Sequence, residues 1–338
     1  MTSNKIKRRE FVKNVTLTSV GMGVLGSSSF AATSIRSAEE IKIGIVGLAV
    51  HSAAFSQILN DPNKESDLKG CRITALYHPP GNPDVDFTKE QLDKFEKDAR
   101  EMGVKIVNSM DEMLDMADVV MIETNDGRPH LEQVMPAFRA GKPVFIDKPI
   151  AADLKGVIEI LDKAKEFNVP IYSSSSLRYL KSAQQVNKSE VMGAYTYSPA
   201  PTEKSHTELF WYGIHGVELL YTVMGEGCKE VMHVHHTEGE DLVIGFWNND
   251  RVGTFRGIRD GRRDYGGTVF GKTANTTLGT FEGYRPLVVK VVEFFLSKKP
   301  PVPIKETLEI YAFMEAAQES RKKGGKKVSL EEILRKSH

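Results

Sequence analysis

The 338-residue chain carries 45 lysines and arginines against 45 aspartates and glutamates, so its formal net charge is zero. This balance gives no bulk attraction to nucleic acid or to an anionic membrane, and a small molecule or a protein is the expected partner. The length exceeds that of one typical core and predicts two domains. Cys71 and Cys228 form no CxxC pair, which excludes a disulfide framework and a zinc ribbon. Two buried thiols, or a single bridge after export, are the alternatives.

The N-terminal residues resemble an export signal. Residues 7–13 (KRREFVK) closely match the twin-arginine consensus, and a weakly apolar stretch follows at residues 15–25. That stretch is shorter than the roughly 20 residues that span a bilayer. We therefore expect a twin-arginine signal peptide over residues 1–38, cleaved between Ala31 and Ala38, and a periplasmic protein without a membrane anchor. The alternative is a frayed basic helix on a cytoplasmic protein.

Short apolar strands alternate with amphipathic helices over residues 39–174. The β-branched run at residues 41–47 (IKIGIVG) suits a buried parallel strand. Further strands are expected at residues 72–77, 104–107, 119–122, 144–146 and 171–173, and helices at residues 52–59, 89–102, 129–140 and 154–167. Strands separated by helices predict an α/β fold, here a Rossmann domain with a doubly wound parallel sheet.

The loop after the first strand occupies the place where such a sheet binds the pyrophosphate of a dinucleotide. Against the fingerprint G-x-G-x-x-G it keeps Gly47 but has Ala49 and Ser52 in place of the other two glycines. Both replacements are small, and His51 and Ser52 can donate to a phosphate or cap the helix. We interpret the loop as a degraded phosphate turn. The alternative is a Rossmann-shaped domain that no longer binds a nucleotide.

The end of the second strand leaves the choice of dinucleotide open. It continues as residues 77–81 (YHPPG), without the acidic residue that holds a ribose 2′-hydroxyl and without an arginine for a 2′-phosphate. Asp84 and Asp86 follow in a stretch whose prolines and glycine predict irregular turns. The expected cofactor is therefore NAD or NADP.

Three ordered motifs resemble those of one family. Residues 147–149 (DKP) resemble its E/D-K-P signature, residues 122–130 (IETNDGRPH) its T-P-N-x-x-H, and residues 213–220 (GIHGVELL) its G-x-H-x-x-D-L-L. From about residue 41 to the C-terminal helices, the chain resembles the Gfo/Idh/MocA family of glucose-fructose oxidoreductase, inositol dehydrogenase and rhizopine-catabolism proteins. That family consists mostly of NAD(P)-dependent oxidoreductases acting on sugars, polyols and their derivatives.

The resemblance implies a catalytic Lys148 and a catalytic His215. A lysine at the carboxyl end of a strand, fixed by the following proline, projects its ammonium toward the nicotinamide, where partial burial lowers its pKa. The alternatives are a surface lysine and a structural histidine. The same motifs place further residues near the cofactor: Thr124, Asn125, His130, Asp147 and Pro149.

The chain departs from the family at one position. Where the family has an aspartate four residues before the catalytic histidine, this chain has Trp211. Tyr212 shares a helical face with His215 and is expected to share its proton transfer. Trp211 and Tyr212 could equally form an aromatic platform for a sugar ring. Substrate contacts are expected from Ser175, Arg178, Trp211 and Glu218, with Arg178 gripping a carboxylate or a row of hydroxyls.

Residues 175–338 predict a second, α+β domain. Strands are expected at residues 194–197, 230–236, 242–247, 251–258, 267–271 and 276–281, and helices at residues 213–224, 287–296, 305–322 and 330–335. The strands predict an open, mostly antiparallel sheet with one face packed on helices. In this family the other face of the sheet often forms an oligomer interface. We therefore expect a homo-oligomer. His233, His235 and His236 lack a carboxylate at matching spacing, so we expect a solvated or interface strand there rather than a metal site.

These patterns together predict an NAD(P)-dependent oxidoreductase acting on a sugar, polyol or glycoside outside the cytoplasm. Because Trp211 replaces the family aspartate, two alternatives stay open. One is redox-neutral, NAD-dependent cleavage or epimerisation of a glycoside. The other is a carbohydrate-binding protein on a Rossmann scaffold, without catalysis.

Overall fold

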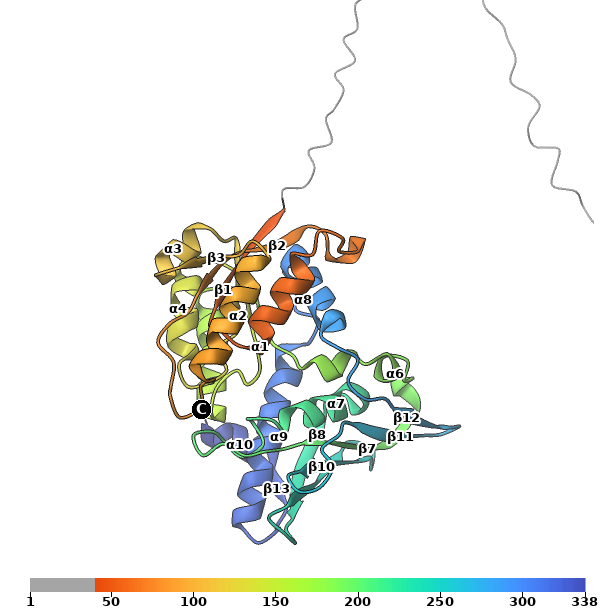
Figure 1. Cartoon of the computed structure of the whole chain (residues 1–338). Helices are drawn as coiled ribbons and strands as arrows, with labels where there is room; N and C mark the ends of the chain where they lie inside the picture. Colours follow the sequence, from red (N-terminus) through yellow and green to blue (C-terminus); the bar gives the residue numbers. More distant parts are fainter. Residues whose placement is uncertain (1–39, 338) are drawn as a thin grey trace, which may run out of the picture. The chain divides into compact units, whose positions relative to one another are not determined.

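The structure is a computed structural model that describes residues 40–337 (Figure 1). The expected signal peptide at residues 1–38 lies outside the described residues. Residues 40–337 belong to one compact unit.

The first sheet has six parallel strands in the order β3-β2-β1-β4-β5-β6. Its strands are β1 (Ile41–Val46), β2 (Cys71–Tyr77), β3 (Lys105–Val107), β4 (Val119–Ile122), β5 (Val144–Ile146) and β6 (Ile171–Tyr172). All four residues of β4 are buried, as expected of a parallel strand covered on both faces. The strand order reverses between β1 and β4, which is where such sheets bind their ligands.

The helices that connect these strands are α1 (Val50–Leu59), α2 (Lys89–Glu101), α3 (Met110–Asp115), α4 (His130–Arg139) and α5 (Leu154–Glu166). The sequence patterns did not predict α3, because it is short and carries one buried residue, Met113. Ser109 begins it by accepting a hydrogen bond from the N–H of Glu112.

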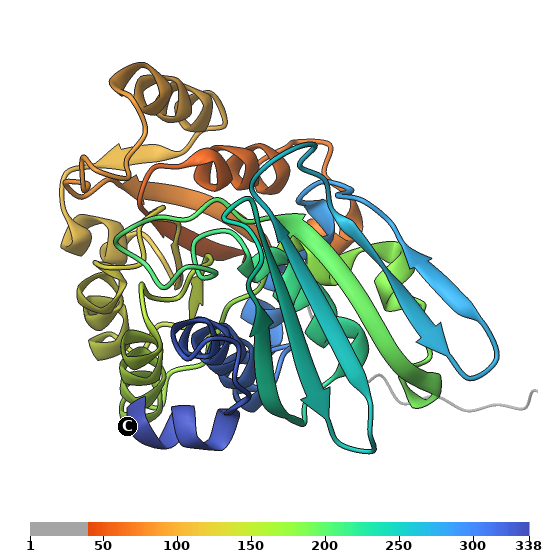
Figure 2. The ribbon, with the colours of Figure 1, turned by 90° about the horizontal axis from the view of Figure 1, so that it is seen from below.

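The second sheet has seven strands in the order β12-β11-β7-β10-β9-β8-β13. They are β7 (Val191–Pro199), β8 (Cys228–Val234), β9 (Glu240–Trp247), β10 (Val252–Ile258), β11 (Gly266–Gly271), β12 (Asn275–Leu278) and β13 (Val328–Ser329). All neighbours pair antiparallel except β7 and β10, which are parallel. Figure 2 shows these strands side by side. The predicted fold class, a Rossmann domain followed by an open, mostly antiparallel α+β domain, is confirmed.

Four further helices complete the fold: α7 (Ile214–Met224), α8 (Arg285–Ser297), α9 (Ile304–Lys322) and α10 (Leu330–Ser337), with the short α6 (Lys181–Gln184) before β7. α7 and α9 pack on one face of the second sheet. α8 returns to the first domain and lies beside α1 (Figure 1). There Val288 and Val291 join Phe55 of α1 in one hydrophobic cluster. α9 packs against α5 in a second cluster that continues under the second sheet. The C-terminal helices therefore bind the two sheets together.

Two local predictions concern single side chains. Cys71 and Cys228 are buried free thiols, which confirms the first of the two alternatives. His233 is not on a solvated face, because it is buried and its Nε2 lies 2.9 Å from Asp241 Oδ1. Within residues 40–337, no helix has the length and hydropathy that crossing a bilayer requires.

Candidate active site

Two adjoining hollows lie where β1, β4 and β5 end and α7 begins. The larger has a volume of about 300 Å³ and is lined by Ala49, Val50, His51, Phe87, Asn125, Asp147, Lys148, Trp211, Tyr212 and Tyr284. The smaller, of about 80 Å³, is lined by His51, Lys148, Ser176, Leu177, Tyr212, His215, Tyr265, Phe281 and Tyr284. Four residues are common to both, so the hollows form one site whose walls come from both domains.

The turn at Gly47 shapes the near wall of this site. Gly47 has a φ of +98°, and a Cβ there would lie 2.4 Å from the backbone nitrogen of Thr124. The buried hydroxyl of Ser52 donates to the carbonyl of Ala49 at 2.7 Å and accepts from its N–H at 2.8 Å. Ser52 therefore caps α1. The N–H groups of Val50, His51 and Ser52 have no intrahelical partner, as in any first helical turn.

Asp147 and Lys148 follow β5 and project into the larger hollow. The Nδ1 atom of His51 lies 2.5 Å from Asp147 Oδ2. Burial alone would raise the pKa of Asp147, but His51 and Lys148 together hold that pKa below its usual range. Burial lowers the pKa of Lys148, and the charge of Asp147 opposes the shift. The lysine ammonium lies 5.2 Å from the centre of the Tyr212 ring.

His215 lies in the first turn of α7 and lines the smaller hollow. Its Nδ1 is 2.7 Å from the Ser175 hydroxyl, which leaves Nε2 as the nitrogen available to a ligand. Burial, followed by the charges of Lys148 and His51, lowers the pKa of His215 well below its ordinary value. His215 is therefore neutral near pH 7 and able to accept a proton.

Arg178 and Glu218 pair with each other inside the protein. Arg178 Nε donates to Glu218 at 2.7 Å, and its Nη1 donates to Glu306 of α9 at 2.6 Å. Glu218 also accepts from the N–H of Ser175 at 2.8 Å and from the hydroxyl of Ser174. The structure thus places the Arg178 guanidinium in an internal ion-pair network, away from the substrate role predicted for it. Through Ser175 the same network supports His215.

Aromatic side chains form the far wall. The Tyr212 ring lies edge-on to His215 at 4.9 Å, and its hydroxyl is 3.0 Å from that of Tyr265. Trp211 lines the larger hollow and packs against His206 at 4.9 Å. Tyr265 and Tyr284 were missed by the sequence interpretation, because they lie outside the recognised motifs and reach the site through the tertiary fold.

The remaining predicted cofactor residues have different surroundings. Asn125 lines the larger hollow, and its amide donates to the carbonyl of Val85 at 3.1 Å. Thr124 is buried and donates to Gln133 at 2.8 Å. His130 is buried, with its ring nitrogens 3.0 Å from the carbonyls of Thr124 and Ile150, so it braces these loops. Pro149 follows Lys148 through a cis peptide bond.

Polar contacts that none of the sequence motifs predicted hold the loop after β2 beside the larger hollow. Arg128 donates to Asp84 and to Asp126 at 2.7 Å each. The imidazole of His206, from the second domain, accepts the N–H of Gly127 at 3.1 Å. These contacts connect the β2 loop, the β4 loop and the second domain beside the larger hollow.

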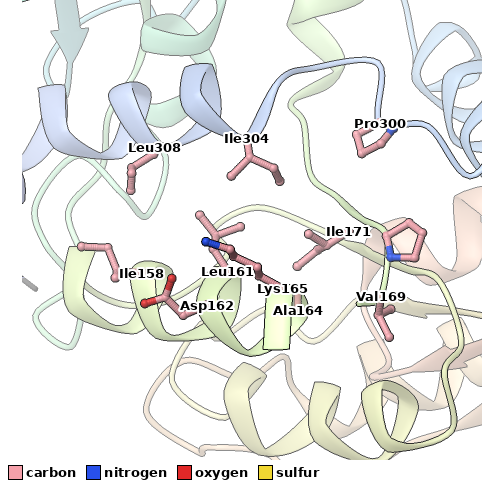
Figure 3. Close-up of a pocket in the computed structure, with 11 residues that line it drawn as sticks. Ile158, Leu161, Asp162, Ala164, Lys165, Val169, Ile171, Pro300, Ile304 and Leu308 are labelled. Atoms are coloured by element: carbon pink, nitrogen blue, oxygen red, sulfur yellow. The ribbon is translucent and has the colours of Figure 1, made fainter. Parts of the chain in front are cut away.

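Two other hollows lie away from Lys148 and His215. One of about 630 Å³ is lined by residues after β2 and along α4, including Tyr77, Pro79, Pro129 and Gln133. Another of about 440 Å³ lies between α5 and the start of α9, where Ile158 and Leu161 face Ile304 and Leu308 (Figure 3). The second is mainly apolar, although Asp162 and Lys165 also line it, and it includes Val169 and Ile171, at the amino end of β6. It therefore lies at the amino ends of the parallel strands, whereas Lys148 lies at their carboxyl ends.

Residues 41–175 match the model of a family described as oxidoreductases with an NAD-binding Rossmann fold, GFO_IDH_MocA. The match covers the Rossmann domain and identifies it as a domain of the Gfo/Idh/MocA family. It is 29% identical to an uncharacterized oxidoreductase of Streptococcus pneumoniae over 46% of this chain and 39% of the relative. It is 34% identical to the inositol 2-dehydrogenase of Azotobacter vinelandii over 30% of this chain and 27% of that enzyme. The matches thus span less than half of these relatives.

Solved structures share the fold of the chain. Scyllo-inositol dehydrogenase from Lactobacillus casei, solved with NAD(H) and scyllo-inositol, superposes with a TM-score of 0.66 at 16% identity, over 87% of this chain and all of that one. The cofactor of the matched family domain is NAD or NADP. The residues present fit a dinucleotide, because the Gly47 turn, the first turn of α1 and Lys148 all border the larger hollow or adjoin it.

Proposed function

We propose that this protein is an NAD(P)-dependent oxidoreductase that oxidises a hydroxyl group of a sugar, polyol or glycoside, or catalyses the reverse reduction. The observation that carries the proposal is the meeting of Lys148, from the Rossmann domain, with His215, from the second domain, at one small hollow. The larger hollow beside it is suited to the nicotinamide half of the cofactor, and the hollow along α4 to the adenosine half. A substrate of modest size and many hydroxyls suits the mixed polar and aromatic lining.

Bound NAD(P) would supply the hydride acceptor or donor. His215 would act as the general base: with its Nδ1–H donated to Ser175, its neutral Nε2 takes the proton of the substrate hydroxyl. The Lys148 ammonium would stabilise the negative charge that develops on that oxygen, in a site where burial strengthens the interaction. Tyr212 lies between the two and would either relay the proton or support the sugar ring.

The first experiment is to denature the purified protein and identify any released nucleotide. We expect NAD or NADP, and a screen of sugars and polyols should then produce NAD(P)H, seen by its absorbance. Lys148→Met should abolish this production, whereas Lys155→Met, at an exposed position of α5, should not. Absence of nucleotide, together with no thermal shift on adding NAD or NADP, would contradict the proposal.

A second candidate function rests on Trp211, which lines the larger hollow where the family has an aspartate. An aromatic wall favours stacking on a sugar ring, either in redox-neutral cleavage or epimerisation with NAD retained or in binding alone. Substrate conversion without net accumulation of NADH would support the redox-neutral reaction. The neighbouring Tyr212 is tested by Tyr212→Phe. A large loss of turnover would mean that the phenol of Tyr212 transfers protons, and near-normal turnover would mean that its ring serves as a stacking surface.

We also propose that the protein is exported by the twin-arginine route to the periplasm. Residues 7–13 support this by their match to the consensus. A reporter fused to residues 1–38 should leave the cytoplasm, and replacing Arg8 and Arg9 together by lysine should retain it. Retention of the unaltered fusion would contradict the proposal.

We further propose that the chain forms a homo-oligomer through the open face of the second sheet. The half-buried Leu242, Ile244 and Phe246 of β9 alternate with buried residues and point away from the helices. Val252 of the adjacent strand β10 and Phe270 of β11, two strands beyond β10, are 41% and 45% exposed. Such an apolar patch suits a self-complementary contact. Sedimentation should show an oligomer that Ile244→Lys dissociates, and a monomeric unaltered protein would contradict the proposal.

A further inference from the structure

Glu123 is a fully buried carboxyl group that the mechanism above does not use. It follows β4 directly, its relative exposure is 0%, and neither of its carboxylate oxygens has a hydrogen-bond partner among residues 40–337. Burying an unpaired carboxylate is costly, so such a group either takes up a proton or meets a cation. The position of Glu123 therefore raises the question of what lies against it.

Two other donor groups converge on Glu123. One ligand atom from each of His51, Glu123 and Asp147 lies within 4.8 Å of the others. The three residues follow β1, β4 and β5, which are neighbours in the parallel sheet, so their carboxyl ends bring the donors to one point. His51 and Asp147 also line the larger hollow, which gives the cluster a route to solvent.

The imidazole is already oriented for ligation. The His51 ring stacks on Phe55 at 5.5 Å, with an interplanar angle of 7°, and Tyr284 meets it edge-on at 4.7 Å. These contacts direct Nδ1 toward Asp147. Supporting contacts of this kind fix the ring orientation of metal-bound histidines.

We propose that His51, Glu123 and Asp147 form a binding site for one divalent first-row transition-metal ion. One imidazole and two carboxylates suit Mn²⁺, Fe²⁺ or Zn²⁺ better than soft ions that prefer thiolates. Two ionised carboxylates and a divalent ion sum to zero, so the ion removes the net charge that the two acids would otherwise bury. Zinc–ligand distances of about 2.0–2.2 Å require the three donors to draw together and the His51–Asp147 hydrogen bond to give way to the ion.

Three protein ligands leave at least one coordination position open, as in catalytic metal sites. Because His51 and Asp147 border the larger hollow, that position faces the space expected to take the ligand. The ion would thus lie next to Lys148 and could bind an oxygen of a sugar or polyol.

The test measures metal binding directly, without dinucleotide or substrate. The full chain, made without a polyhistidine tag and stripped with a chelator, is titrated with Mn²⁺ and followed by electron paramagnetic resonance, and with Zn²⁺ by calorimetry. We expect about one ion per chain. Glu123→Gln and Asp147→Asn should each weaken binding at least tenfold, and Glu159→Gln, at an exposed position of α5, should leave it unchanged.

Thermal melting shows that the variants fold and supplies a second readout. The metal should raise the melting temperature of the unaltered protein and of Glu159→Gln, but not that of the two ligand variants. No saturable binding, or binding that both ligand variants retain, overturns the proposal. If Glu123→Gln raises the melting temperature while the unaltered protein binds no metal, the site holds a proton only and the proposal is likewise overturned. Failure here leaves the proposed oxidoreductase function standing, because nucleotide identification and substrate turnover test that function separately.

Discussion

The internal network around Glu218 provides the sharpest test of how the second domain supports the site. Glu218→Gln keeps the shape of the side chain but removes its charge, which pairs with Arg178 at 2.7 Å in a buried position. Breaking a buried ion pair by removing one partner costs about 3–5 kcal/mol. Arg178 retains its second partner, Glu306, at 2.6 Å, so we expect the lower end of that range, about 3 kcal/mol.

The corresponding shift in melting temperature follows from the size of the folded part. At about 2.1 cal/mol/K per residue, roughly 300 residues have an unfolding entropy of about 0.6 kcal/mol/K, so 3 kcal/mol lowers the melting temperature by about 5 °C. Circular dichroism during heating, checked by urea denaturation, measures the shift. Glu159→Gln, which removes an exposed carboxylate from α5, should change the melting temperature by less than about 1 °C.

The two interpretations of Glu218 predict opposite results. If it contacts substrate, as the sequence interpretation expected, Glu218→Gln raises KM while the melting temperature stays unchanged. Because Glu218 lies in a buried network, we expect the melting temperature to fall. An unchanged melting temperature with a raised KM would refute the structural interpretation.

Three further predictions concern the site. Lys148→Met and His215→Asn should each lower turnover at least about a hundredfold while dinucleotide affinity, measured by fluorescence titration, persists. Burial lowers the pKa of His215, so kcat/KM should stay level as the pH falls to about 6.5 and decline only below that pH, where protonation removes the base. A decline of kcat/KM that begins at or above pH 6.5 would contradict this role. Gly47→Ala should destabilise the protein and weaken dinucleotide binding, because its Cβ meets Thr124, whereas Gly103→Ala, with a φ of +77° in open space, should cost only the backbone strain of about 1–2 kcal/mol. Equal losses of stability in the two alanine variants, measured by urea denaturation, would show that the contact with Thr124 is unimportant.

Periodicity was sufficient to predict the fold because both sheets follow simple burial rules. The buried parallel strand β4 is a continuous apolar run, and β9 alternates buried and half-buried residues along its whole length. The short elements α3 and β13 escaped prediction, since six and two residues carry too little periodic signal. Their positions depend on tertiary packing.

The candidate site was predictable where a motif marks a strand end or a helix start. Lys148 and His215 follow from such motifs, and the structure brings them to one hollow. The environment of Arg178 was not predictable, because its partners Glu218 and Glu306 are 40 and 128 residues away. A charged residue beside a predicted site is equally compatible with ligand contact and with an internal ion pair, and only three-dimensional contacts distinguish them.

The altered glycine fingerprint illustrates how a motif can lose residues and keep its geometry. Gly47 remains necessary because its positive φ and the nearby Thr124 backbone leave no room for a side chain. At the second glycine position, the N–H of Ala49 is bound by Ser52, and at the third position Ser52 itself is small enough to be fully buried between helix and strand. In this turn, a helix cap by Ser52 therefore replaces the close approach of the backbone that glycines would allow. A pyrophosphate at this place would meet the N–H groups of the first turn of α1, from Val50 to Ser52, so affinity for the dinucleotide should depend on that cap more than on Ala49.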